Sequence, residues 1–219
     1  MPVYKLSAEG AKIFPPARLA DFDGLLAYGG DLCIERLVNA YSNGIFPWFN
    51  PEEEILWWAP KMRFVIFPSE IKISRSLKKL ISSGELETRF NFDFPAVINS
   101  CGELRAGKTW LGKNMQAAYI DLFNAGHALS AGVYKNDELV GGLYGVALGK
   151  CFFGESMFSL VPSASKVALV ALAERLKAEG FLFIDCQFHT PHLESMGGRY
   201  ISWDEYHRLL REGRRDFSG

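Results

Sequence analysis

Apolar and polar residues follow two different periods along this chain. Residues 138–158, ELVGGLYGVALGKCFFGESMF, contain two continuous apolar runs separated by Gly149 and Lys150. Such runs are typical of neighbouring buried strands, although the glycines within them weaken a strand. Residues 161–180 instead repeat their apolar positions at helical spacing, with Ser163 near the start and Gly180 past the end. Strands and helices that follow one another in this way predict a mixed α/β (α+β) fold.

Turn and cap signals predict the other elements and a division into two domains. We expect strands at 62–67, 129–134, 138–147, 150–154 and 181–188, and helices at 32–43, 70–82, 93–102 and 114–126. Asp31 is the expected N-cap of the first helix, and Gly44 is its left-handed end. Residues 1–61 are rich in proline, turn residues and aromatic side chains. We therefore assign them to a small N-terminal domain and residues 62–219 to a larger one.

The predicted helix at 70–82 is basic on one side. The basic residues fall within one arc, opposite the apolar positions of the helix: Lys72, Arg75, Lys78 and Lys79. A solvated helix face is the default interpretation of such an arc, and a strip that contacts phosphates is the alternative. No acidic residue lies between Ile71 and Gly84, which favours the phosphate-contacting strip.

Composition says little about the partner and more about the compartment. The 219 residues include 24 basic and 25 acidic side chains, so bulk charge does not predict nucleic-acid binding, although a local patch still could bind a polyanion. The four cysteines include no CxxC pair, and we expect reduced thiols in a cytoplasmic protein. The longest apolar stretch, 139–149, is too short to cross a membrane, and the first ten residues lack the apolar core of a signal peptide.

Residues 102–109, GELRAGKT, match the phosphate-binding motif G-x-x-x-x-G-K-[ST] letter for letter. The apolar strand that ends in Asp185 would complete a nucleotide hydrolase that uses Lys108 and Asp185. That motif, however, requires a buried strand before its first glycine and a helix at its lysine. The preceding DFPAVINSC has the Asp cap and early proline of a helix, and TWLGKN places a Trp and a Gly where the second helix should begin. We favour a chance match and keep the hydrolase as an alternative.

The segment HTPH contains His189 and His192, close to Cys186. Two histidines three apart on a helix can bind a metal. Pro191 lies between them and the segment follows a strand, which argues against helical geometry. We therefore predict loop histidines and no metal site.

Three polar residues form the strongest candidate site. Asp185 and Gln187 lie two apart on the predicted strand 181–188, so their side chains should face the same side, and Glu155 follows directly on the apolar CFF strand. A buried Asp is costly unless it is paired or faces a cleft, so a structural Asp is the alternative interpretation. If the two strands are neighbours, two carboxylates and a carboxamide meet at one cleft, which suits a cation or an amine. Four glycines would leave room for close approach to the backbone there: Gly141, Gly142, Gly145 and Gly149.

Several longer blocks can be compared with known families. They are AYGGDL, GIFPWF, WWAP, TWL, LVGGLYGVALGKCFFGESMFS, ASKVALV, IDCQ and HLESMGGR, and they run from about Gly24 to Arg199. Together they resemble the bacterial leucyl/phenylalanyl-tRNA–protein transferases, with GESMFS and IDCQ as the most specific pair. The resemblance implies transfer of Leu or Phe from charged tRNA to proteins that begin with Lys or Arg, which marks them for degradation. It also implies a GNAT-like acyltransferase domain and no metal or coenzyme. A monomer is our default expectation.

The resemblance also implies binding residues. Trp48 and Trp110 match tryptophans that meet the tRNA end, where aromatic faces can stack on the terminal adenine. The pocket for the Leu or Phe side chain maps to four apolar positions: Leu143, Phe152, Leu172 and Ile184. An apolar pocket distinguishes side chains only by shape and burial, so it can accept both. The tRNA-contacting helix of the family matches the basic residues Arg75, Lys78 and Lys79.

Glu155, Asp185 and Gln187 match the catalytic and acceptor-recognition positions of the family. We expect the Gln187 side-chain oxygen to accept a hydrogen bond from the attacking amine, and Asp185 to orient that amine or to relay its proton. Glu155 would hold the cationic end of the acceptor or the aminoacyl group. Because a carboxamide is not basic, the proton could pass to Asp185, to the substrate or to water.

The chain also departs from the family pattern. LSAGVY at 129–134 stands where the family usually has H-S-V-E-x-W, so Leu129, Gly132 and Tyr134 replace a His, an acid and a Trp. Two further functional alternatives are a non-catalytic tRNA-binding module and a coenzyme A-dependent acetyltransferase. The three polar residues argue against the first. The absence of a Q/R-x-x-G-x-G/A loop before ASKVALV argues against the second.

Overall fold

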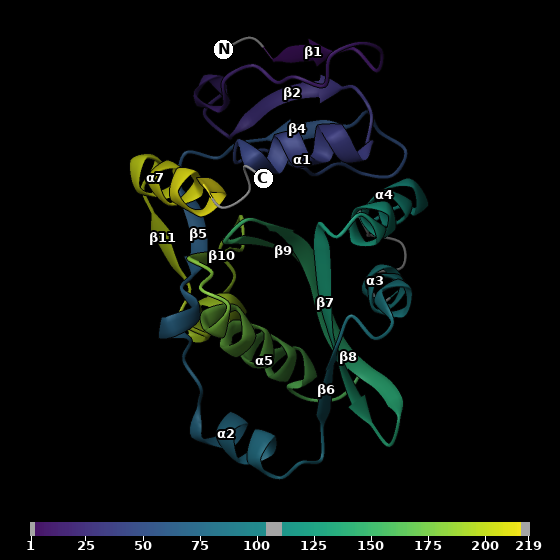
Figure 1. Ribbon diagram of the computed structural model, residues 1–219, viewed down its shortest axis with the longest axis vertical. Coiled ribbons are helices and arrows are strands. Elements are labelled where there is room, and N and C mark those ends of the chain that lie inside the picture. The colour runs from purple at the N-terminus through teal and green to yellow at the C-terminus, as the bar shows by residue number, and fades with distance from the viewer. Residues whose placement is uncertain (1–2, 104–110, 216–219) are drawn as a thin grey trace.

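The computed structural model describes residues 3–103 and 111–215, which form two β-sheets with helices packed around the larger one (Figure 1). The smaller sheet has the order β1-β2-β4-β3 and consists of β1 (Tyr4–Leu6), β2 (Leu25–Gly29), β3 (Phe46–Pro47) and β4 (Leu56–Trp58). The larger sheet has the order β11-β5-β10-β9-β8-β7-β6 and consists of β5 (Arg63–Ile66), β6 (Glu87–Phe90), β7 (Ala128–Lys135), β8 (Glu138–Leu148), β9 (Cys151–Ser159), β10 (Phe183–Asp185) and β11 (Arg199–Ile201). The mixed α/β class predicted from the sequence is confirmed.

Helices cover both faces of the larger sheet. They are α1 (Ile34–Ser42), α2 (Arg75–Ser82), α3 (Phe94–Glu103), α4 (Lys113–Asn124), α5 (Ala164–Ala178), α6 (Pro191–Ser195) and α7 (Trp203–Arg214), with short 3-10 helices at Ala17–Leu19 and Pro68–Glu70. Buried side chains of α5 and α2 pack on one face, together with Phe152 and Ile184. Buried side chains of α1, α3, α4 and α7 pack on the other face, together with Phe153 and Phe183. The alternation of neighbouring residues along β9 and β10 thus separates two cores.

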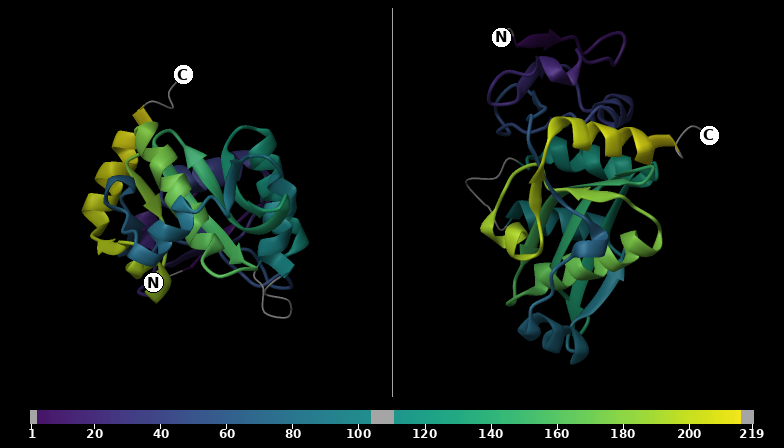
Figure 2. Two further views of the ribbon diagram at one scale, coloured as in Figure 1. Left: turned by 90° about the horizontal axis from the view of Figure 1, so that it is seen from below. Right: turned by 90° about the vertical axis from the view of Figure 1, so that its left-hand side faces the viewer.

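The smaller sheet shares a hydrophobic core with one face of the larger sheet. Leu26 and Trp57 of the smaller sheet belong to the same buried cluster as Tyr206 and Leu210 of α7. Figure 2 shows α7, in yellow, between the smaller sheet and the rest of the molecule. The expected division into domains at 1–61 and 62–219 therefore stays a prediction, because the apolar packing is continuous across it.

Two strand boundaries differ from those predicted. The expected strand 150–154 was too short, since β9 runs on to Ser159, and Glu155 lies within the strand rather than at its end. The expected strand 181–188 was too long, since β10 ends at Asp185. Gln187 has a φ of 57°, in the left-handed region, so the chain turns there and cannot continue as a strand.

Two helix starts also differ. The helix predicted at 70–82 begins at Arg75, because the Ser74 hydroxyl accepts from the Leu77 amide at 3.2 Å and so caps it. The first helix begins at Ile34 with Cys33 as N-cap, and the Asp31 cap was wrong. The predicted C-terminal end of that helix is confirmed, because Gly44 follows the helix with a φ of 73°, in the left-handed region.

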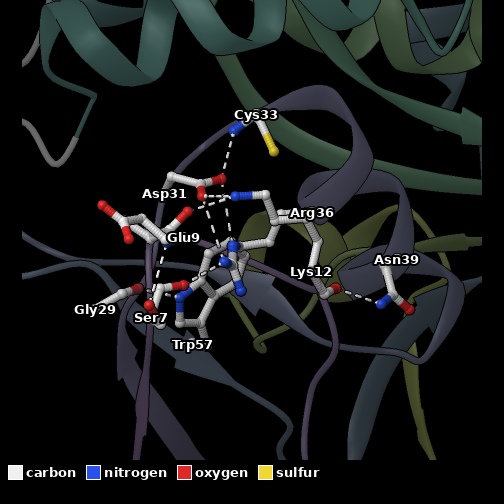
Figure 3. Close-up of polar contacts among 10 residues, drawn as sticks. Ser7, Glu9, Lys12, Gly29, Asp31, Cys33, Arg36, Asn39 and Trp57 are labelled. Atoms are coloured by element: carbon white, nitrogen blue, oxygen red, sulfur yellow. Dashed lines mark hydrogen bonds and ion pairs between the residues drawn. The ribbon is translucent and has the colours of Figure 1, made fainter.

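The Asp31 carboxylate instead ties the N-terminal segment to α1 (Figure 3). It accepts hydrogen bonds from the Cys33 amide at 3.1 Å, from Lys12 at 2.6 Å and from the buried Arg36 guanidinium at 3.3 Å. Arg36 also donates to the Ser7 carbonyl at 2.6 Å. These donors outweigh burial, which acts in the opposite direction, and hold the pKa of Asp31 well below its usual range.

The glycines of β8 and the turn after it are required by close packing of the protein on itself. A Cβ at Gly141 would collide with Ala164 at the start of α5, and a Cβ at Gly149 would collide with the Gly213 carbonyl of α7. A Cβ at Gly145 would collide with the Phe153 carbonyl and the Phe152 ring. The prediction that these glycines make room for a substrate was therefore wrong: α5, α7 and β9 fill that room.

Candidate active site

A β-bulge places Glu155 at the site. Along the β8–β9 ladder, Gly145 pairs with Gly154 but the next residue, Tyr144, pairs with Ser156. Glu155 is therefore the extra residue on β9, opposite no residue of β8. A bulge of this kind bends a strand and redirects a side chain. Gly145 permits it, because any side chain there would meet the β9 backbone.

The Glu155 carboxylate is held by two tyrosines. Tyr41 of α1 donates to its Oε1 and Tyr119 of α4 donates to its Oε2, each at 2.7 Å, and the two hydroxyls lie 2.7 Å from each other. Burial raises the pKa of Glu155 to about 7, and the hydrogen bonds from Tyr119 and Tyr41 limit the rise. The carboxyl group can therefore exchange a proton near neutral pH.

The Gln187 side chain meets Glu155 from the end of β10. Its Nε2 donates to Glu155 Oε1 at 3.3 Å. Because an ionised carboxylate can only accept, the carboxamide must present nitrogen to Glu155, which leaves its oxygen available to another donor. The two strands are indeed neighbours: β9 and β10 pair in parallel, with Ile184 beside Phe152 and Asp185 beside Phe153.

Asp185 lies behind this pair rather than in the cavity. Its side chain is fully buried, and it forms an ion pair with the buried Arg63 guanidinium. Tyr206 donates to Asp185 Oδ2 at 2.7 Å, and the Gln187 amide donates to Oδ1 at 2.9 Å. Arg63 in turn donates to the Gly44 carbonyl at 2.7 Å.

The predicted placement of Asp185 was therefore wrong. Asp185 and Gln187 do not face the same side of a strand, because the strand ends between them. Asp185 instead holds the Gln187 backbone in its left-handed conformation, which is unfavourable for a residue with a Cβ. A direct contact between Asp185 and an attacking amine does not fit this geometry, and a positioning role does.

A cavity of about 580 Å³ opens beside Glu155 and Gln187. It is lined by five of the residues that the family resemblance assigned to substrate binding: Trp48, Leu143, Phe152, Leu172 and Ile184. They come from β8, β9, α5, β10 and the segment between β3 and β4, and Trp48 of that segment is exposed at the rim. An apolar interior with a few polar groups at one side is typical of a small-molecule site.

Sequence reasoning missed the residues that support this site. Tyr41, Tyr119, Arg63 and Tyr206 each contact Glu155 or Asp185, yet none stands near them in sequence or in a recognisable motif. The one available signal was the buried position of an arginine in an apolar strand, since a buried charge requires a partner.

The remaining candidates fall outside the cavity. Arg75, Lys78 and Lys79 are exposed on α2, and none forms an ion pair with another described residue. Trp110 and Lys108 lie outside the described residues. Gly102, the first glycine of the phosphate-binding motif, lies within the helix α3 rather than after a buried strand, as expected for a chance match.

Neither histidine of HTPH has a metal-site arrangement. His189 contacts Glu194 at 2.9 Å, and His192 lies on the short helix α6, contrary to the predicted loop, and lines the cavity. Over residues 3–103 and 111–215, no three His, Cys, Asp or Glu side chains come together as metal ligands would. In the same ranges, every helix is too short or too polar to span a bilayer.

The fold and site together define a mixed α/β protein that can take an apolar side chain next to a carboxylate and a carboxamide, as a group-transfer enzyme would. Two family models match the sequence: leucyl/phenylalanyl-tRNA protein transferase over residues 65–211, and the N-terminal domain of the same enzyme over residues 30–61. The chain therefore belongs to the leucyl/phenylalanyl-tRNA protein transferase family and is an aminoacyltransferase.

Individual relatives agree with the family models. A leucyl/phenylalanyl-tRNA–protein transferase of Pseudomonas entomophila is 53% identical over 88% of this chain and 87% of its own length. One from Thiobacillus denitrificans is 52% identical over 92% of this chain and 90% of its own.

This chain can also be compared with solved structures. A crystal structure of a conserved protein of unknown function from Bacteroides thetaiotaomicron matches 77% of this chain and 62% of its own, with a TM-score of 0.46 and 11% identity.

Proposed function

We propose that the protein transfers Leu or Phe from charged tRNA to the N-terminal Lys or Arg of acceptor proteins, and that the cavity beside Glu155 is where transfer occurs. Membership of the family carries the reaction class. The observation that carries the site is the hydrogen bond between Glu155 and Gln187 at the edge of an apolar cavity.

The donor side chain occupies the apolar part of the cavity, against Leu143, Phe152, Leu172 and Ile184. Burial of a Leu or Phe side chain is worth about 1.5–3 kcal/mol, and neither requires a polar partner. Trp48 at the rim is placed to stack on the terminal adenine, with Trp110 as the second expected contact. The ester carbonyl would then lie near the two polar side chains.

Gln187 and Glu155 hold the acceptor amine while it attacks that carbonyl carbon. The free side-chain oxygen of Gln187 accepts a hydrogen bond from the amine. Glu155, with a pKa of about 7, takes the proton that the amine must lose. The new C–N bond forms, the bond from the carbonyl carbon to the ribose oxygen breaks, and that oxygen receives a proton as the tRNA leaves. Alignment alone supplies several kcal/mol, because the ester is already activated.

Asp185 acts in this proposal as a positioning residue. It holds the Gln187 backbone amide, and Arg63 and Tyr206 hold Asp185. The exposed basic residues of α2 provide contacts for the tRNA phosphates. We also propose a GNAT-like arrangement for residues 62–219, for which the parallel pair β9–β10 joined through α5 is the supporting feature. The cytoplasmic location and the monomeric state stay predictions from the sequence.

The test is a transfer assay read by mass spectrometry. The protein is incubated with phenylalanyl-tRNA, or in parallel with leucyl-tRNA, and a peptide that begins with Lys. We expect the mass of one Phe or Leu residue to be added to the peptide, and none to be added to a matched peptide that begins with Ala. Absence of any product from both charged tRNAs would contradict the proposal. Unchanged transfer by Lys108→Ala without added nucleotide would eliminate the hydrolase alternative.

A further inference from the structure

Phe188 and Trp48 form an exposed aromatic pair at the rim of the cavity. Phe188 is 39% exposed and Trp48 is 43% exposed, and both line the cavity. Their ring centroids lie 5.4 Å apart with the planes inclined at 51°. Phe188 also meets the buried Phe46 ring edge-on at 5.7 Å. Exposed aromatic rings that gather beside a cavity indicate a surface that a ligand covers.

The backbone joins this pair to the Glu155–Gln187 site. The Phe188 amide donates to the Cys186 carbonyl at 2.6 Å, which closes a tight turn around Gln187. That turn sends the Gln187 side chain toward Glu155 and the Phe188 ring toward Trp48. An aromatic face is thereby held one residue away from the carboxamide that would receive the attacking amine.

We propose that Phe188 is a further aromatic contact for the terminal nucleoside of the aminoacyl-tRNA, in addition to Trp48 and the expected Trp110. Two rings inclined at 51° cannot sandwich a base between parallel faces. The base instead stacks on Trp48, and its edge or its ribose packs against Phe188. A nucleobase fits because every base has a flat aromatic face. The inference rests on the proposed function and adds a residue that determines where the donor end lies.

The test compares the two substrates separately. With phenylalanyl-adenosine as a minimal donor and a Lys peptide as acceptor, Phe188→Ala should raise the KM for the donor about five-fold or more, from the lower end of the range expected for an aromatic contact with one base. The kcat and the KM for the peptide should stay within about two-fold of the wild type. Phe188→Tyr should restore the donor KM, and Phe188→Leu should restore it only in part, because Leu keeps apolar area but not the ring face. Phe22→Ala, at a Phe that is 94% exposed and outside the cavity, is the matched control and should change nothing.

A binding measurement makes the result independent of transfer. Calorimetry with an unreactive amide-linked analogue of phenylalanyl-adenosine should show weaker binding to Phe188→Ala by the same factor as the rise in KM. The thermal unfolding midpoint of Phe188→Ala should stay near that of the wild type, because the Phe188 ring is partly exposed. A rise in the peptide KM with an unchanged donor KM would overturn the proposal and assign Phe188 to the acceptor. Unchanged values for both substrates would also overturn it. A wild-type protein that transfers nothing would instead contradict the proposed function, and the binding assay separates that outcome.

Discussion

At the scale of single residues, the proposed transfer depends on the protonation of Glu155. Burial disfavours its charge, and the hydroxyls of Tyr41 and Tyr119 favour it, so its pKa settles at about 7. A base is most useful when its pKa lies near the operating pH. An exposed glutamate, with the usual pKa of 4.5, would be a weak acceptor for the proton of an amine.

We expect the rate of transfer to depend on the protonation of Glu155. Transfer needs its ionised form, so kcat/KM should fall as the pH drops below about 7, more steeply than titration of the acceptor amine alone requires. Glu155→Gln should lower kcat by about a hundred-fold or more and remove that extra steepness. The measurement is kcat/KM from pH 5.5 to 8.5 for both proteins. Identical slopes would show that Glu155 does not titrate in the reaction.

The same carboxyl group should make stability depend on pH. Its pKa is higher in the folded protein than its usual value of 4.5, so the folded state binds the proton more tightly. Relative to Glu155→Gln, the wild type should therefore lose stability as the pH rises from about 4.5 to about 7, and the difference should level off above that. Urea unfolding of both proteins at pH 5.5 and 8 tests the sign. A wild type that gains stability relative to Glu155→Gln between pH 5.5 and pH 8 would contradict the burial of this charge.

Asp185 offers a prediction that separates stability from positioning. Asp185→Ala leaves the buried Arg63 charge without its partner and should cost about 3–5 kcal/mol of unfolding free energy. The double variant Arg63→Met, Asp185→Leu removes both charges and should recover most of that stability. It should not recover kcat, because nothing then holds the Gln187 amide. Urea unfolding and transfer kinetics of the three proteins provide the comparison. Recovery of kcat in the double variant would show that Asp185 has only a structural role.

At the scale of elements, the bulge in β9 and the early end of β10 create the site. In a regular β9, the direction of the Glu155 side chain would follow from strand alternation alone. In a longer β10, the backbone would continue as a strand at Gln187 and would not turn there. The departures from regular strand geometry bring Glu155 and Gln187 to 3.3 Å. Irregular backbone at a functional site is a common arrangement, because it aims side chains that regular strands cannot.

Gly145 is the element-scale test. Its substitution by Ala would place a Cβ against the Phe153 carbonyl and the Phe152 ring, so the bulge must shift. We expect a loss of about 2–3 kcal/mol in unfolding free energy and a fall of at least ten-fold in kcat. Gly154→Ala, directly opposite on β9, meets its nearest neighbour at 3.6 Å and should retain the wild-type stability to within about 1 kcal/mol. Equal losses in the two variants, measured by urea unfolding, would contradict a specific role for Gly145.

At the scale of the whole molecule, the proposed RNA contacts lie far apart. Trp48 belongs to the loop between β3 and β4 beside the smaller sheet, whereas α2 lies at the opposite end of the molecule (Figures 1 and 2). A nucleoside reaches only the first of these positions, and an intact tRNA can reach both. Contacts with the terminal nucleoside and contacts with phosphates should therefore be separable.

Removing the positive charges of α2 should weaken the binding of tRNA and leave the binding of phenylalanyl-adenosine unchanged. The triple variant Arg75→Ala, Lys78→Ala, Lys79→Ala should raise the KM for phenylalanyl-tRNA by about ten-fold or more at low salt, and reduce its dependence on salt. The KM for phenylalanyl-adenosine should not change. Lys177→Ala, at an exposed position on α5, serves as the control. An unchanged salt dependence in the triple variant would place the phosphate contacts elsewhere.

Local patterns in the sequence predict some features of this protein and not others. Period and turn chemistry predicted α3, α4 and α5 and the strands β5, β7 and β8 to within a few residues, because those signals are local. Asp185 shows the limit. Its place after an apolar strand was visible in the sequence, but its direction depended on where the strand ended. The turn at Gln187 is held by tertiary hydrogen bonds, and no local propensity predicts it for a glutamine.

The sequence by itself determined the mixed α/β class, most of the elements and the family, because these depend on local periodicity and on motifs of adjacent residues. Only the tertiary structure decided which polar groups meet. Tyr41 lies 114 residues from Glu155 along the chain, and Arg63 lies 122 residues from Asp185. Contacts over such separations follow from the packing of α1, α4, α7 and β5 around β9 and β10. The protonation of Glu155 and the burial of Asp185 both result from that packing.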